Sequence, residues 1–138
     1  MKQLAQKYFS TKWPALIWSA IVFVLLAMPS RSFQFPNERL FVIPHFDKFV
    51  HAAVFLVIVI LWAFYFATKT STVKFSSVIL ITAVLVTVYG MALEYVQLFV
   101  GRDFDVWDMV ADGTGATLGW LYNIKKISPG RNRGRNQN

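Results

Sequence analysis

The sequence predicts an all-α fold, an integral membrane bundle of four transmembrane helices with both termini on the cytoplasmic side. Of the 138 residues, 56% are hydrophobic and only 15% are charged, and the apolar residues gather in long runs. A helix needs about 20 predominantly apolar residues to cross a hydrocarbon layer of about 30 Å. Composition and run length therefore predict the membrane bundle, and the positions of the basic residues predict its orientation.

Four segments are predicted to form these helices. The first three are roughly Phe9–Met28, Phe49–Ala67 and Val78–Val100, and each is long and almost free of charge. The fourth, roughly Asp105–Ile124, is less apolar because it carries three aspartates and three glycines. The first segment also has the basic start and apolar middle of a secretory signal peptide, but the stretch LAMPS offers no small-x-small cleavage site. A retained first span is therefore expected.

The distribution of lysine and arginine predicts that the fourth segment also crosses the membrane. Basic residues favour the cytoplasmic segments of membrane proteins. With four spans and cytoplasmic termini, ten of the 14 basic residues lie on the cytoplasmic side, and the other four are Arg31, Arg39, Lys48 and Arg102. With three spans, the cytoplasmic side would hold only five and the opposite side nine.

The chain is expected to form a single membrane domain over residues 1–124, with its motif-bearing core at residues 47–121. Residues 125–138 are polar and basic and are expected to form a disordered cytoplasmic tail. The basic residues are divided among three cytoplasmic segments without interleaved aromatic residues, so the net charge of +7 predicts no nucleic-acid partner. The absence of cysteine excludes disulfides, thiol catalysis and thiolate metal sites.

Acidic residues are concentrated in one short stretch of this apolar chain. Five of the seven lie between Glu94 and Gly113, and the predicted topology places all seven on or near the outer side. An ionised carboxylate at the centre of a span costs about 2.5–3.5 kcal/mol on insertion scales. Ionisable residues kept inside a membrane therefore indicate a functional site.

Residue spacing predicts which of these polar side chains share a helix face. Asp47 and His51 are four residues apart where the second span begins, and Lys48 is adjacent to Asp47. Glu94 and Gln97 are three residues apart near the outer end of the third span. Each pair is therefore expected to present both side chains on one side of its helix.

The fourth span carries a polar stripe with the spacing of one helix face. Asp105, Asp108 and Asp112 follow the pattern i, i+3, i+7, and Gly115 and Gly119 continue the same stripe as the sequence GATLG. Two small residues four apart allow another helix to approach closely. The acidic stripe is therefore expected to face the inside of the bundle.

The charges of this region do not balance. Arg102 is expected to pair with neighbouring carboxylates and to close the hairpin between the third and fourth spans. If Asp103 and Asp105 are solvated at the surface, four carboxylates remain against two basic side chains, those of Lys48 and Arg102. Protons, a charged His51, a bound cation or a basic partner would have to supply the difference.

Three motifs occur in an order that resembles the VanZ-like family of small bacterial integral membrane proteins. They are DKFVH at Asp47–His51, EYVQ at Glu94–Gln97 and GRDFDVWDMVADGTGATLG at Gly101–Gly119. The resemblance implies a multi-pass protein of the bacterial inner (cytoplasmic) membrane. It also implies a role in the cell envelope and in antibiotic resistance, because the family is named for a protein that raises resistance to teicoplanin. The family more usually carries asparagine at the position of Asp112, so this chain has an additional potential charge there.

Three hypotheses for the function follow, and the first is preferred. It describes a non-enzymatic envelope protein whose outward polar pocket binds a lipid-linked envelope component. The polar residues assigned to this pocket are Asp47, Lys48, His51, Glu94, Gln97, Arg102, Asp105, Asp108 and Asp112. The second hypothesis is a membrane-embedded hydrolase or transferase that uses a divalent metal on a lipid-linked substrate.

The second hypothesis has suitable ligand chemistry but no catalytic motif. Imidazole and carboxylate groups suit Mn, Zn or Mg, and the candidate ligands are Asp47, His51, Glu94 and Asp108. The chain has no HExxH sequence and no nucleophile motif, so no metal or other cofactor is assigned. A third possibility, an ion-coupled carrier, is disfavoured because the cytoplasmic halves of the spans carry no polar path.

Overall fold

The computed structural model describes residues 11–28 and 46–126, and this part of the chain is all-α, as predicted. It contains four helices and no strand, and the helices are α2 (Trp13–Ala27), α3 (Phe46–Lys69), α4 (Thr72–Phe99) and α5 (Val106–Lys126). Their order and approximate bounds follow the four predicted segments. The helix α5 runs two residues into the predicted tail, and the rest of that tail lies outside the described residues.

Two residues, Gly101 and Asp105, determine the local structure of the connection between α4 and α5. Gly101 has a φ of 75°, a left-handed conformation that glycine adopts without steric cost. The backbone N–H of Arg102 donates to the carbonyl of Gln97, which is the bond that closes a Schellman turn at a helix end. The carboxylate of Asp105 then accepts from the backbone N–H of Trp107 at 2.8 Å and caps α5.

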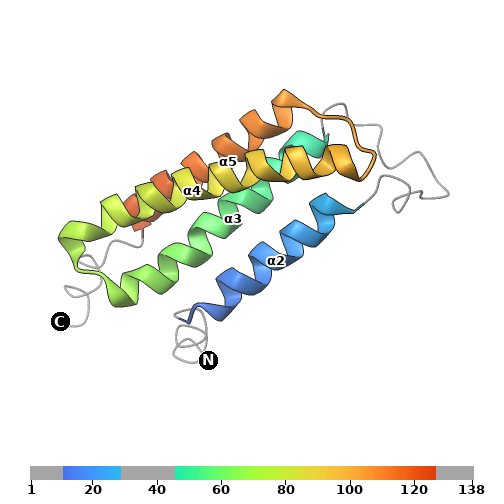
Figure 1. Cartoon of the computed structure of the whole chain (residues 1–138). Helices are drawn as coiled ribbons and strands as arrows, with labels where there is room; N and C mark the ends of the chain where they lie inside the picture. Colours follow the sequence, from blue (N-terminus) through green and yellow to red (C-terminus); the bar gives the residue numbers. More distant parts are fainter. Residues whose placement is uncertain (1–10, 29–45, 127–138) are drawn as a thin grey trace.

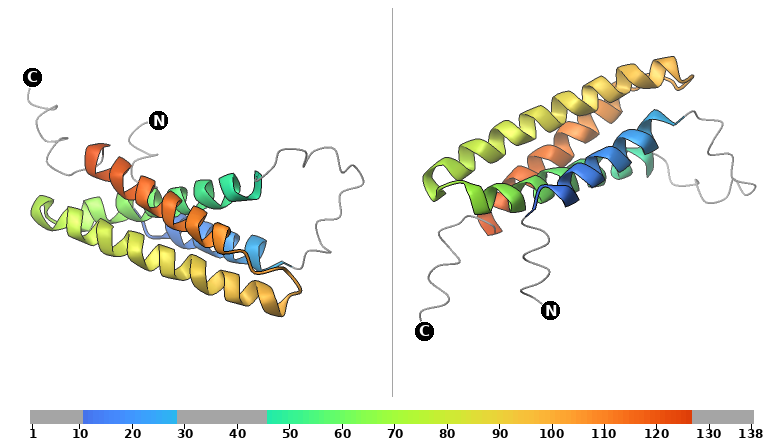
Figure 2. Two further views of the ribbon diagram at one scale, coloured as in Figure 1. Left: turned by 90° about the horizontal axis from the view of Figure 1, so that it is seen from above. Right: turned by 60° about the horizontal axis from the view of Figure 1, so that its bottom comes forward.

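The four helices run along one another as a bundle (Figure 1). The closest packing is between α3 and α5, and α4 packs against both. Helix α2 lies against α3 and α4, as the further views show (Figure 2). The start of α2, the turn from α3 to α4 and the end of α5 lie at one end of the bundle (Figure 1). The start of α3 and the connection from α4 to α5 lie at the other.

The exposed faces of the bundle are apolar. Helix α4 exposes Ile81, Leu85 and Val88 to at least half of their area, while its opposite face buries Ile79 and Leu93 in the core. Helices α3 and α4 are long and apolar enough to cross a membrane, and α2 is apolar but shorter. An apolar outer surface of this extent is typical of a protein that is surrounded by lipid, because exposing so much apolar surface to water would be unfavourable.

Candidate functional site

A group of polar side chains lies at the end of the bundle where α3 begins and where α4 connects to α5. Three helices and one connection contribute to it, although these segments are far apart in sequence. We call this group the polar cluster, and its members are Asp47, Lys48, His51, Glu94, Gln97, Asp105, Asp108 and Asp112. It divides into an outer part around Lys48 and an inner part around His51.

Lys48 is the centre of the outer part. Its Nζ lies 2.6 Å from Asp105 Oδ2, 3.0 Å from Asp108 Oδ1 and 3.1 Å from Asp47 Oδ2. The lysine on α3 is therefore tied to the beginning of α5 by charge-assisted hydrogen bonds. The expectation that Asp105 is merely solvated has to be corrected, because it is the closest partner of Lys48. Of the acidic residues in the described ranges, only Asp103 is exposed without a role in this group.

Among the residues that the structure describes, Arg102 does not make the ion pair that its position in the sequence suggests. Within the described residues its Nη1 approaches the carbonyl of Leu26, at the end of α2, at a long distance of 3.5 Å. The reason is the packing of α3 on α5, which brings Lys48 beside Asp105 and Asp108. Arg102 follows α4 directly and lies on the side of the bundle where α2 ends.

His51 forms the centre of the inner part, and its orientation is set by Asp112. The ring Nδ1 lies 2.8 Å from Asp112 Oδ1, and both residues are almost fully buried. With Asp112 ionised, Nδ1 carries a proton and donates a hydrogen bond to the carboxylate. The other ring nitrogen, Nε2, faces Asp108, whose Oδ2 is 3.9 Å away, and it carries a lone pair when the ring is neutral.

Three buried polar groups in this region lack a hydrogen-bond partner among the residues that the structure describes. They are Glu94 Oε1, Gln97 Nε2 and Asp112 Oδ2. Glu94 is fully buried, and its other oxygen accepts a long bond of 3.4 Å from the backbone N–H of Asp105. An unsatisfied buried polar group costs about 1–3 kcal/mol, so such groups indicate a missing partner.

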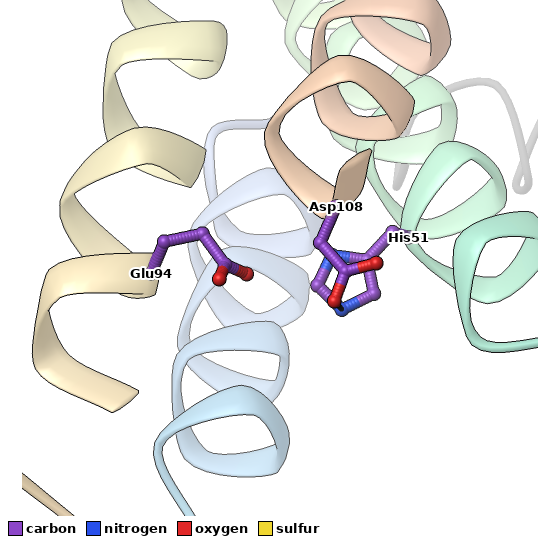
Figure 3. A group of neighbouring side chains, drawn as sticks. All are labelled: His51, Glu94 and Asp108. Atoms are coloured by element: carbon purple, nitrogen blue, oxygen red, sulfur yellow. Dashed lines mark ion pairs between the residues drawn. The ribbon is translucent and has the colours of Figure 1, made fainter. Parts of the chain in front are cut away.

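Figure 3 shows that His51, Glu94 and Asp108 converge from α3, α4 and α5. One ligand atom from each lies within 4.8 Å of the other two, and all three residues are buried. Asp47, Asp105 and Asp108 satisfy the same distance criterion, but Lys48 Nζ already contacts all three. The four metal candidates of the sequence analysis are therefore divided, because Asp47 belongs to the outer part.

The two glycines of the GATLG sequence lie at the contact between α5 and α3. A Cβ at Gly115 would overlap the backbone of Ala52, and a Cβ at Gly119 would come within 2.8 Å of Val59. A third glycine, Gly90 on α4, was not selected from the sequence. A Cβ there would collide with the carboxylate of Asp112 and with Phe55, and its only signal was its isolation within an apolar span.

A hollow of about 290 Å³ lies deeper along the bundle than the polar cluster. Its lining is mainly apolar, and it includes Trp62, Leu85 and Tyr89 from α3 and α4. The hydroxyl of Tyr89 donates to the backbone carbonyl of Ser19 on α2 at 2.9 Å, so the hollow lies where three helices meet. A surface of this kind accepts a hydrocarbon chain more readily than a polar molecule.

Four packed helices, two of them of membrane-spanning character, together with a charged cluster buried at one end, describe a helical membrane protein. The family model of VanZ/LLP1 matches residues 3–126, which is nearly the whole chain. The chain therefore belongs to the VanZ/LLP1 family, and the resemblance inferred from its motifs is confirmed. No curated protein and no solved structure matches the chain.

Proposed function

We propose that the chain is an integral protein of the bacterial cytoplasmic membrane, with four spans, cytoplasmic termini and an outward-facing polar cluster. The distribution of charge in the described bundle supports this orientation. Lys69, Lys74, Lys125 and Lys126 lie toward one end, and the acidic residues gather at the other. Helix α2 has 15 residues and a length of about 22 Å, which is shorter than a hydrocarbon layer of about 30 Å. The bilayer therefore thins around it, or the span includes residues before Trp13.

The topology has a direct test, because the chain contains no cysteine. Single cysteines at Ser71, in the turn before α4, and at Asp103, before α5, report on opposite ends of the bundle. A membrane-impermeant maleimide on intact cells is expected to label Asp103→Cys and to leave Ser71→Cys unlabelled. Permeabilised membranes serve as the control, in which both cysteines react. Labelling of both residues, or of Ser71→Cys alone, in intact cells would contradict the topology.

The proposed function is binding of the polar head of a lipid-linked envelope component by this cluster, without catalysis. One observation carries the proposal: Gln97 Nε2, Glu94 Oε1 and Asp112 Oδ2 are buried without partners in the described part of the chain. A ligand that supplies hydrogen-bond donors and acceptors would satisfy them and recover the free energy that their burial costs. The acyl or isoprenyl part of such a ligand would remain in the lipid or in the apolar hollow beside Leu85.

Charge defines the chemistry of the head group that fits. The cluster has five carboxylates, four of them buried or partly buried, and Lys48 is already shared among three of the five. Hydroxyl and amine groups of sugars or peptides are therefore the preferred ligand groups, because carboxylates accept from them. Arg102, at the rim, is the side chain available to a phosphate. The resemblance to VanZ-like proteins makes teicoplanin susceptibility of the cells the physiological readout.

Binding is tested with a fluorescent lipid-linked amino-sugar and peptide precursor of the cell wall, added to the protein in lipid nanodiscs. Gln97→Leu and Arg102→Ala are each expected to raise the Kd at least about tenfold, as the loss of one charge-assisted or buried hydrogen bond does. Gln97→Leu also removes an unpaired buried amide, so it should fold as well as the wild type. Asp103→Asn, an exposed neighbour, is the matched control. Equal affinity of Gln97→Leu and Asp103→Asn would contradict the proposal.

A further inference from the structure

We propose that His51, Glu94 and Asp108 form a site for one divalent transition-metal ion, Zn²⁺ or Mn²⁺, and that Asp112 is the residue that positions His51. The site occupies the inner part of the polar cluster. It depends neither on the proposed envelope ligand nor on the orientation of the bundle in the membrane.

The separation of the ligand atoms fits a shared ion better than direct contact. His51 Nε2 and Asp108 Oδ2 are 3.9 Å apart, too far for a hydrogen bond. Zinc binds nitrogen and oxygen ligands at about 2.0–2.2 Å in tetrahedral geometry, so two ligand atoms on one ion are about 3.3–3.6 Å apart. One atom each from His51, Glu94 and Asp108 lies within 4.8 Å of the others. The ligand atoms of each pair would have to approach by about 0.5–1.5 Å to complete the coordination, which small side-chain rotations supply.

Glu94 provides an independent indication that something binds here. It is fully buried in a helix of membrane-spanning character, and its Oε1 has no partner within the described residues. Figure 3 shows its carboxylate pointing across the gap toward Asp108 and His51. A buried carboxylate oxygen without a partner is unfavourable, and coordination of a cation removes that cost.

The contact between His51 and Asp112 is the arrangement that supports a metal-binding histidine. Histidine ligands usually donate their second ring N–H to a carboxylate, which selects the tautomer and holds the ring in position. Here Nδ1 lies 2.8 Å from Asp112 Oδ1, so Nε2 is left to accept the metal. The neighbouring Gly90 leaves the space that the Asp112 carboxylate occupies, because a Cβ there would lie 2.5 Å from Oδ2.

Comparison with the outer part of the cluster shows why the inner part is assigned to a metal. Asp47, Asp105 and Asp108 have equally close oxygens, but the ammonium of Lys48 lies among them. No lysine or arginine of the described residues contacts Glu94 or Asp112. A dication would offset much of the remaining negative charge, which is costly at this depth in a membrane.

The donor set defines the class of ion. One imidazole nitrogen and two carboxylates suit Zn²⁺ and Mn²⁺, whereas Ca²⁺ takes six to eight oxygen ligands. Three protein ligands leave at least one coordination position for water or for a ligand group. Asp108 belongs to both parts of the cluster, because its Oδ1 accepts from Lys48 while Oδ2 faces His51. An ion in the inner part is therefore coupled electrostatically to Lys48.

The test measures metal alone, with no envelope ligand present. Protein in lipid nanodiscs is stripped with a chelator, loaded with ZnCl₂ or MnCl₂ and desalted, and bound metal is measured by mass spectrometry. About one ion per chain is expected for the wild type and for the control variant Asp103→Asn. His51→Gln and Glu94→Gln are expected to lose stoichiometric metal. Glu94→Gln removes a buried charge and should insert at least as well as the wild type, which gel filtration and circular dichroism check.

Two variants of Asp112 distinguish a positioning role from a merely structural one. Asp112→Asn keeps an oxygen that accepts from His51 Nδ1, so the Kd for Zn²⁺ should stay within about tenfold of the wild type. Asp112→Leu removes that acceptor and should raise the Kd by about 10–100-fold. Folded wild-type protein without stoichiometric metal would overturn the site, as would full metal content in Glu94→Gln. Neither result bears on ligand binding by Gln97→Leu, so the two proposals fail separately.

Discussion

Gly115→Ala is expected to destabilise the fold by about 3 kcal/mol, the upper end of the range for overpacking. The added methyl group would lie within 2.8 Å of both the Cα and the carbonyl carbon of Ala52. The obstacle is the backbone of α3, which cannot rotate away as a side chain can. The helices α3 and α5 would have to separate along their closest contact. Asp108 and Asp112 would then move away from Lys48 and His51.

Gly113→Ala is the matched control, because it places the same methyl group on the same helix two residues earlier. Its nearest neighbour would be the Thr87 side chain at 3.5 Å, an ordinary van der Waals contact. Helix propensity favours alanine over glycine by about 1 kcal/mol, so this variant should match or exceed the wild type in stability. Thermal unfolding in lipid nanodiscs, followed by tryptophan fluorescence, measures both variants. Similar unfolding midpoints for Gly115→Ala and Gly113→Ala would show that the contact between α3 and α5 is not this close.

The second large effect is expected from Lys48→Met, which keeps an apolar side chain of similar length but removes the ammonium. Asp47, Asp105 and Asp108 would then face one another without their shared partner. We expect a loss of about 1–3 kcal/mol. The side chains of Lys48 and Asp105 are 21% and 37% exposed, so solvent screening keeps the loss below that of a fully buried pair.

A second substitution tests the cause of this loss. Asp108→Asn in the Lys48→Met background removes the most buried of the three negative charges and should restore part of the stability. Lys69→Met, at the other end of α3, is the control and should behave as the wild type, because Lys69 is exposed. If Lys48→Met and Lys69→Met unfold at the same temperature, Lys48 does not hold α3 and α5 together.

Much of the fold was predictable because long apolar runs have few alternatives to a helix. The bounds predicted for α3 and α4 differ from those observed by at most six residues, and the largest difference is at the beginning of α4, where Lys74 lies within the helix. Asp105 was assigned to the fourth span by its spacing, yet it precedes α5 and caps it. Periodicity cannot distinguish the first residue of a helix from its N-cap, because the N-cap position continues the spacing of the helical residues that follow it.

The site was predictable as a set of helix faces but not as a set of partners. Spacing places Asp108 and Asp112 on one face of α5 and Glu94 with Gln97 on one face of α4, and all four are buried. It cannot say which basic residue reaches these acids: both Lys48 and Arg102 were counted against them, and among the described residues only Lys48 contacts them. Long side chains from other helices compete for the same carboxylate, and only the packing of the helices decides among them.

The sequence by itself determined the helical class, the order of the helices and the family, because these depend on run length, spacing and motif order. The tertiary structure decided the division of the cluster into two parts. Close packing at Gly115 sets the distance between α3 and α5 and thereby places Lys48 against Asp105 and His51 against Asp112. Hydrogen bonds and coordination depend on differences of a few tenths of an ångström between helices, and no spacing along one chain encodes such a distance.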